Sequence, residues 1–207
     1  MDSNIPDPTM VQPVDRLRAF ESLAASTRYI HPFVQNSDEL MSEMLKDASW
    51  NHMASRSVAS YGVAYAGLKS YATSGENFRS PPLPECLLKL CHQIKERFGF
   101  EPNNCLLNYY RNDSSKIGFH SDSIAEIDVG TGIAILSLGA ERELSFRHAR
   151  DFTVSGGKVL QDGSLFYMTR EMQCDWQHAI LPSKTEVQAR MSLTFRLLHD
   201  HFGLHTT

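Results

Sequence analysis

Hydrophobic residues recur at different spacings in the two halves of the chain. In the first half, apolar residues at helical spacing predict helices over residues 37–46 and 85–98, and a weaker one over 14–30. In the second half, Gly, Asp and Ser clusters separate short runs that predict strands: 105–110, 132–138, 143–147, 163–168 and 190–196. Short strands at this spacing are typical of a β-sandwich or barrel, with the helices gathered in the first half of the chain.

The last of these candidate strands alternates polar and apolar residues. Arg190 and Arg196 would share one face, while Leu193 and Phe195 would pack on the other. A buried arginine needs an anionic partner, so two of them on one strand facing a cavity suit a dicarboxylate ligand. Salt bridges to carboxylates of the protein itself are an equally good explanation of both arginines.

A candidate metal site comes from His120 and Asp122, which lie two residues apart, and from His178 downstream. Residues i and i+2 point the same way in a strand or at its end, so one imidazole and one carboxylate could face a common point. A second imidazole from another strand would complete a set of two histidines and one carboxylate, which suits Fe(II); the ligands alone do not exclude zinc. Taken alone, the His-x-Asp pair also fits a surface loop, and His178 fits a half-buried histidine beside Trp176.

Length and charge limit the classes of function. The chain has 207 residues, a net charge of -4 and 42% hydrophobic residues, which predict one globular domain and argue against binding nucleic acid by bulk positive charge. It has no apolar run of about 18 residues, no signal-peptide pattern at its start and no C-x-x-C pair among its four cysteines. We therefore expect a soluble protein with reduced thiols and no membrane partner, in the cytoplasm or, in a eukaryote, the nucleus.

Five stretches together resemble the AlkB family of Fe(II)/2-oxoglutarate-dependent dioxygenases, and the resemblance covers roughly residues 57–198. They are Leu107–Asn112, Ile117–Asp122, Ser137–Ala140, Asp175–Ile180 and Arg190–Arg196. Any one of them could be fortuitous, but their order and spacing make the match specific.

The resemblance implies an α+β, mostly β fold: a double-stranded β-helix, or jelly roll, with N-terminal helices packed against it. We expect a flexible tail over residues 1–13 and a single AlkB-like domain over 14–207. In that domain, residues 14–100 would form the helices and a substrate lid, and 101–198 the jelly-roll core.

The resemblance also implies the site residues. His120, Asp122 and His178 match the iron ligands of the family. Arg190 would pair with the distal carboxylate of 2-oxoglutarate and Arg196 would lie near its metal-bound end. Side chains that match the full set of cosubstrate-binding positions are Asn108, Tyr110, Arg190, Ser192 and Arg196; many family members have Asn where this chain has Ser192.

The implied cofactor is Fe(II), with 2-oxoglutarate and O2 as cosubstrates. Such an enzyme hydroxylates a C–H bond, and an N-methyl group so hydroxylated leaves as formaldehyde. The expected function is oxidative demethylation of N-alkylated nucleobases in single- or double-stranded DNA or RNA. Tyr61 and Tyr65 resemble part of a nucleotide-recognition lid and Arg111 part of a basic rim; ordinary strand tyrosines and a solvated surface explain them equally well.

Ile124 departs from the pattern of the family. Repair members usually carry a carboxylate two residues after the iron-binding Asp, which accepts a hydrogen bond from the base. Ile124 is at this position of the substrate pocket and cannot accept that bond. A small molecule, a nucleoside or a protein side chain is therefore an alternative substrate, and a non-catalytic jelly-roll binding module is a third hypothesis. A stable protein partner cannot be inferred from the sequence.

Overall fold

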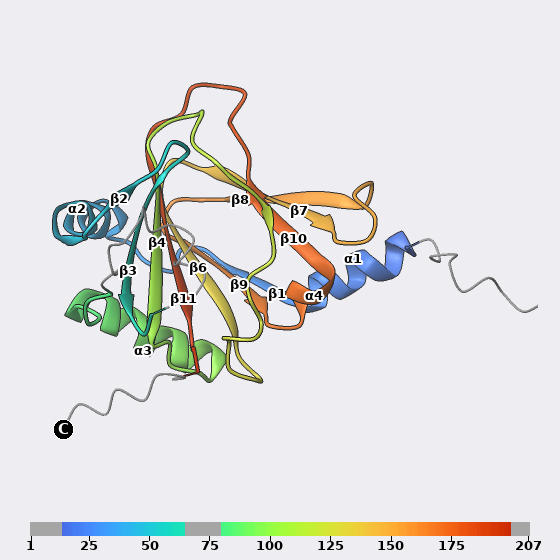
Figure 1. Ribbon diagram of the computed structural model, residues 1–207, viewed down its shortest axis with the longest axis horizontal. Helices are drawn as coiled ribbons and strands as arrows, with labels where there is room; N and C mark the ends of the chain where they lie inside the picture. The colour runs from blue at the N-terminus through green and yellow to red at the C-terminus, as the bar shows by residue number, and fades with distance from the viewer. Residues whose placement is uncertain (1–13, 65–79, 200–207) are drawn as a thin grey trace, which may run out of the picture.

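A computed structural model describes residues 14–64 and 80–199 of the chain (Figure 1). The tail predicted over residues 1–13 lies outside the described residues, and so does Tyr65 of the predicted lid. None of the helices in the described ranges is long and apolar enough to cross a membrane.

Two antiparallel sheets form the body of the described fold. The larger sheet has the order β1-β9-β6-β11-β4-β3-β2 and the smaller one β5-β10-β7-β8. The strands of the larger sheet are, in that order, Thr27–Ile30, Ser164–Thr169, Gly132–Gly139, Arg190–Arg196, Asn104–Tyr110, Ser57–Gly62 and Asn51–His52. Those of the smaller sheet are Ile117–His120, Trp176–Ile180, Arg142–His148 and Ser155–Leu160.

The chain crosses repeatedly between the two sheets, so that strands distant in sequence become neighbours. The central strand β11, last in the chain, pairs with both β4 and β6, and β10 pairs with both β5 and β7. This antiparallel arrangement, mostly β with helices outside, confirms the predicted jelly roll.

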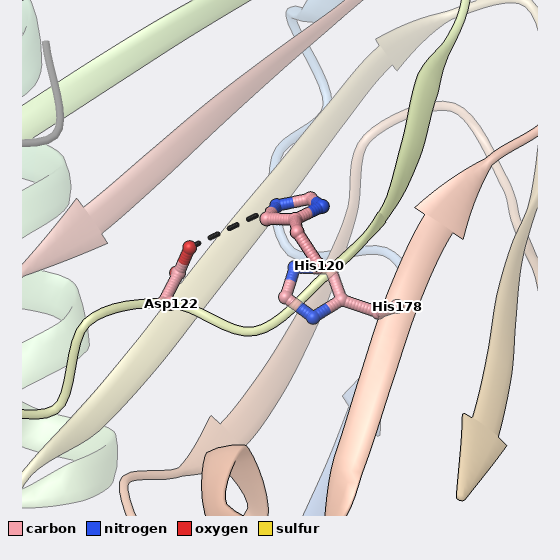
Figure 2. A group of neighbouring side chains, drawn as sticks. All are labelled: His120, Asp122 and His178. Carbon is pink, nitrogen blue, oxygen red and sulfur yellow. Dashed lines mark ion pairs between the residues drawn. The ribbon is translucent and has the colours of Figure 1, made fainter. Parts of the chain in front are cut away.

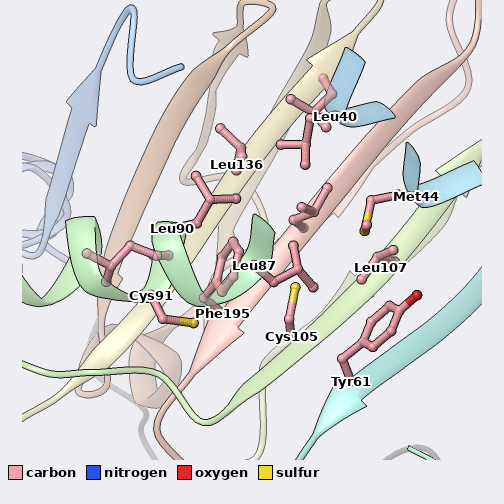
Figure 3. Close-up of a cluster of buried hydrophobic side chains, with 14 of the residues drawn as sticks. Leu40, Met44, Tyr61, Leu87, Leu90, Cys91, Cys105, Leu107, Leu136 and Phe195 are labelled. Carbon is pink, nitrogen blue, oxygen red and sulfur yellow. The ribbon is translucent and has the colours of Figure 1, made fainter. Parts of the chain in front are cut away.

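Two longer helices cover the outer face of the larger sheet (Figures 1 and 3). The first, α2 (Ser37–Asp47), buries Leu40 and Met44, which lie one turn apart on one face. The second, α3 (Glu85–Phe98), starts after Pro84 and ends at Gly99, whose φ of 79° is the left-handed conformation that glycine adopts most easily. The remaining helices are α1 (Arg16–Ala25) and the short α4 (Met172–Asp175).

Because helices cover one face of the larger sheet and the smaller sheet covers the other, its central strands β4, β6 and β11 are buried on both sides. Along β11, Met191, Leu193 and Phe195 pack in the core beneath the helices. The alternate residues Arg190 and Arg196 face the space between the sheets. The predicted alternation of this strand is therefore confirmed, and it places polar side chains in the interior of the jelly roll.

One local expectation differs from the structure. The weak helix expected over residues 14–30 ends at Ala25, and the β-branched and aromatic segment Thr27–Ile30 pairs with β9 instead. Ser37, the first residue of α2, donates a hydrogen bond to Asp162 at 2.7 Å, and Asn36 is the N-cap residue. Strands β1, β2 and β3 join the larger sheet from the first 100 residues, while the expected division at residue 101 stays a prediction.

Candidate active site

The three predicted metal ligands lie close together beside strands β5 and β10 of the smaller sheet (Figure 2). His120 is the last residue of β5, Asp122 follows two residues later, and His178 lies in the middle of β10. Antiparallel pairing of β10 with β5 puts His178 directly opposite His120, with ring centroids 4.4 Å apart. One potential ligand atom from each of the three residues lies within 4.8 Å of the other two, a geometry that could hold a metal ion.

Each of the two imidazole rings has a nitrogen that could bind a metal. Nδ1 of His120 lies 2.8 Å from the carbonyl oxygen of Gly118; since a carbonyl only accepts, Nδ1 carries a proton and Nε2 is the ring nitrogen that could bind a metal. That Nε2 is 3.9 Å from Oδ1 of Asp122. Burial, with a further contribution from His120, lowers the pKa of His178 to about 3, so its ring is neutral at pH 7, the form that binds metals.

Asp122 stays ionised despite its burial. Burial alone would raise its pKa, but Arg196 and the two imidazoles outweigh this and hold the pKa at about 2. Nη2 and Nε of Arg196 both donate to Oδ2, at 2.7 and 3.2 Å. The site therefore offers an ionised carboxylate beside two imidazole rings.

A cavity of about 440 Å³ opens beside these ligands, between the two sheets. All five predicted cosubstrate-binding side chains line it, together with the three candidate ligands. Its apolar wall comes from both sheets: Leu106, Ile117, Ile135, Leu144 and Ile180. The sequence analysis did not assign these apolar residues to the site, although Leu106 shares the inward face of β4 with Asn108 and Tyr110.

Arg190 is a buried cation with spare hydrogen-bonding capacity. It is 1% exposed, and its Nε donates to Ser137 Oγ at 2.9 Å, while its guanidinium carbon lies 5.2 Å from the centre of the Tyr110 ring. Its Nη1 is buried with no hydrogen-bond partner among the described residues. Burial lowers the pKa of Arg190 to about 10, so the group is still charged at neutral pH. A carboxylate in the cavity would satisfy both the charge and the donor.

Arg56 is a cavity residue rather than part of a surface rim. It precedes β3, is 5% exposed, and its Nε donates to Asn108 Oδ1 at 2.8 Å. This bond fixes the amide of Asn108 so that its oxygen faces Arg56 and its nitrogen is left to donate elsewhere. The sequence alone does not indicate that Arg56 is buried. Its burial comes from its position just before β3, a strand that pairs with β4.

The three described members of the predicted substrate-binding set, Tyr61, Arg111 and Ile124, are not among the residues that line the cavity. The assignment of Tyr61 is wrong: its side chain is 5% exposed and packs with the core beneath the helices, on the other face of the sheet (Figure 3). Strand alternation explains this, because Tyr61 pairs with Cys105, which also faces the helices. Arg111 is exposed and is not among the lining residues of the described cavity. Ile124 is partly buried, and its carbonyl accepts a hydrogen bond from Arg170 at 3.1 Å.

The donor set fits the metal that the resemblance implies. Two imidazole nitrogens and one carboxylate oxygen are the facial arrangement found around non-haem Fe(II), which leaves other coordination positions open. His178 Nδ1 is also buried without a hydrogen-bond partner in the described part of the chain. A site with three ligand atoms in reach, a depressed carboxylate pKa and a neutral buried imidazole fits a divalent cation.

Sequence comparisons find dioxygenases. The bovine (Bos taurus) alpha-ketoglutarate-dependent dioxygenase alkB homolog 3 is 29% identical over 187 residues, which are 83% of this chain and 65% of that protein. The human (Homo sapiens) DNA oxidative demethylase ALKBH2 is 31% identical over 152 residues, 70% of this chain and 57% of that protein. The chain thus spans less than two thirds of the length of these relatives.

Solved structures match the fold at low sequence identity. The structure of OsALKBH1 superimposes with a TM-score of 0.65 at 15% identity, covering 83% of this chain and 97% of the other. An oxidoreductase of the 2OG-Fe(II) oxygenase family from Burkholderia pseudomallei gives a TM-score of 0.58 at 16% identity, covering 90% and 92%. The family model of the 2OG-Fe(II) oxygenase superfamily matches residues 8–196 of the chain. With its jelly roll, its candidate ligands and this match over most of its length, the chain belongs to the 2OG-Fe(II) oxygenase superfamily.

Proposed function

We propose that the protein is a Fe(II)- and 2-oxoglutarate-dependent dioxygenase that oxidatively demethylates N-alkylated nucleobases in DNA or RNA. The observation that carries the proposal is that a three-residue ligand set and a buried, incompletely paired arginine face the same cavity. The names of the relatives, a dioxygenase and a DNA oxidative demethylase, support the reaction and the substrate class.

His120 Nε2, Asp122 Oδ1 and one ring nitrogen of His178 would hold the iron. When bound, the iron would supply the oxidative chemistry that couples 2-oxoglutarate decarboxylation to C–H hydroxylation. The low pKa values of Asp122 and His178 keep these two ligands free of protons at neutral pH. Metal binding then requires no proton release from these groups.

Arg190 would anchor the distal carboxylate of 2-oxoglutarate. Its Nε already donates to Ser137, which orients the guanidinium, and its Nη1 has no hydrogen-bond partner among the described residues. Asn108, Tyr110 and Ser192 line the same cavity and supply further hydrogen-bonding groups. The apolar wall would exclude water from the reacting carbon.

A small molecule or nucleoside is the second candidate substrate, and Ile124 favours it. Repair members of the family usually carry a base-contacting carboxylate two residues after the iron-binding Asp. In this chain the residue two positions after Asp122 is the apolar Ile124. Without that acceptor, discrimination among alkylated bases would lose a polar contact.

Product analysis separates the two substrates. The iron-loaded protein with 2-oxoglutarate should release formaldehyde from oligonucleotides carrying 1-methyladenine or 3-methylcytosine, tested as single- and double-stranded DNA and RNA. His120→Ala is the matched control and should release none. Succinate formation without formaldehyde from any methylated oligonucleotide would overturn the nucleobase assignment and favour the small-molecule substrate.

A further inference from the structure

We propose that Gln173 is a positioning residue that fixes Asp122 relative to His178; the inference rests on the proposed metal-binding function. Gln173 belongs to the short helix α4, which leads directly into β10. Its side chain is 4% exposed, and among the described residues it is not one of those that line the cavity. It therefore acts on the site through another residue.

The backbone of Asp122 depends on Gln173 for a hydrogen bond. β5 ends at His120, so the N–H of Asp122 lies beyond the strand ladder while its residue is buried. Oε1 of Gln173 accepts from this N–H at 3.0 Å. On the other side, Nε2 of Gln173 points at Met168 Sδ at 3.8 Å, which fixes the orientation of the amide. A buried N–H without a partner is strongly unfavourable, so the contact specifies where the Asp122 backbone lies.

A second hydrogen bond ties the same two segments together. Oγ of Ser121 donates to the carbonyl oxygen of Trp176 at 3.0 Å. Gln173 and Trp176 both lie just before His178 in the sequence. The loop that carries Asp122 is thus held by the backbone segment that carries His178, in addition to the pairing of His120 with His178.

Arg196 completes the restraint from the opposite sheet. It holds Oδ2 of Asp122, whereas Gln173 holds the backbone N–H of the same residue. With both ends fixed, Oδ1 remains directed toward His120 Nε2. Groups that orient metal ligands in this way are worth about 10- to 100-fold in metal affinity.

The test measures Co(II) binding to the metal-free protein by calorimetry and by the visible absorption of bound Co(II). Gln173→Met keeps the length of the side chain but replaces a strong acceptor with a weak one. We expect its Co(II) dissociation constant to rise about 10- to 100-fold, with an altered visible spectrum, because Asp122 is no longer held in place. Gln173→Glu keeps an acceptor oxygen and should restore both the affinity and the spectrum toward those of the wild type.

Met172→Ala is the matched control, since Met172 is buried on the same helix and is not itself hydrogen-bonded to the Asp122 loop. It should destabilise the fold without weakening Co(II) binding. Unchanged Co(II) affinity of Gln173→Met, or an equal loss in Met172→Ala, would overturn the positioning role. If Gln173→Met does not fold, Gln173→Asn, whose shorter side chain draws the acceptor away from the Asp122 N–H, takes its place, and unchanged affinity in that variant overturns the proposal. A wild-type protein that binds no Co(II) would instead refute the metal site itself.

Discussion

Arg196 and Asp122 form a buried ion pair in which Nε and Nη2 of the arginine both donate to Oδ2 of the carboxylate. Their side chains are only 3% and 6% exposed. Because Arg196 occupies Oδ2, the other oxygen is left 3.9 Å from Nε2 of His120. The pair therefore compensates two buried charges and also determines which carboxylate oxygen faces the imidazoles.

Asp122→Asn should destabilise the metal-free protein, because it removes the carboxylate charge that pairs with the buried Arg196. Removing one partner of a buried ion pair costs about 3–5 kcal/mol. We expect the free energy of unfolding, measured by urea titration, to fall by this amount. Arg111→Gln, at an exposed arginine, should change it by less than about 0.5 kcal/mol. A loss of less than about 1 kcal/mol in Asp122→Asn would show that the pair is not the main restraint on Arg196.

Arg190→Gln should weaken 2-oxoglutarate binding while leaving metal binding intact. The substitution removes the charge that the buried Nη1 would present to a carboxylate. Loss of one charge-assisted contact costs about 2 kcal/mol, which corresponds to about a 30-fold higher dissociation constant. Calorimetric titration of the Mn(II)-loaded protein with 2-oxoglutarate measures it, with Arg111→Gln as the control. Equal affinities in the wild type and Arg190→Gln would remove Arg190 from the cosubstrate site.

Tyr61→Phe tests whether the Tyr61 side chain contributes to substrate binding. The hydroxyl of Tyr61 is buried without a hydrogen-bond partner among the described residues, and burial raises its pKa. Its removal should raise the free energy of unfolding by about 1 kcal/mol and leave the KM for substrate unchanged. An increased KM with an unchanged free energy of unfolding would instead show that Tyr61 contributes to substrate binding.

Two buried thiols should make the protein less stable at alkaline pH. Burial raises the pKa of Cys91 to about 12 and that of Cys105 well above its ordinary value of 9.0. Above pH 9 the unfolded chain loses these protons while the folded protein keeps them, so the free energy of unfolding falls as pH rises.

Each such thiol contributes a slope of up to about 1.4 kcal/mol per pH unit. Urea titrations between pH 8 and 10.5 should therefore give a shallower decline in Cys105→Ala than in the wild type. Cys174→Ala, whose side chain is exposed, is the control and should decline as the wild type does. Identical slopes for Cys105→Ala and the wild type would contradict the assigned burial of this thiol.

Much of the fold was predictable because its main elements have simple hydrophobic patterns. α3 and the central strands β4, β6 and β11 appear in the sequence as a helical stripe and as short apolar runs. β8 (Ser155–Leu160) was missed because it is an exposed edge strand containing two glycines, so no buried face imposes an apolar pattern on it.

The candidate metal and cosubstrate residues were predictable from motifs, and the structure brings all eight of them together around one cavity. The hydrogen bonds that hold these residues in place were not predictable. Gln173 and Arg56 act through hydrogen bonds to residues 51 and 52 positions away, and no local pattern encodes such pairs. Tyr61 was misassigned because its sequence neighbourhood resembles a lid, whereas the face on which it lies is set by the register of β3 against β4.

The most direct test of the account is succinate formation from 2-oxoglutarate by the metal-free protein after addition of Fe(II). We predict that succinate appears only when Fe(II), 2-oxoglutarate and O2 are all present. It should disappear with a chelator and in His120→Ala, whose circular dichroism spectrum should match that of the wild type. A folded wild-type protein that makes no succinate under these conditions, or a His120→Ala variant that makes it at the wild-type rate, would contradict the account.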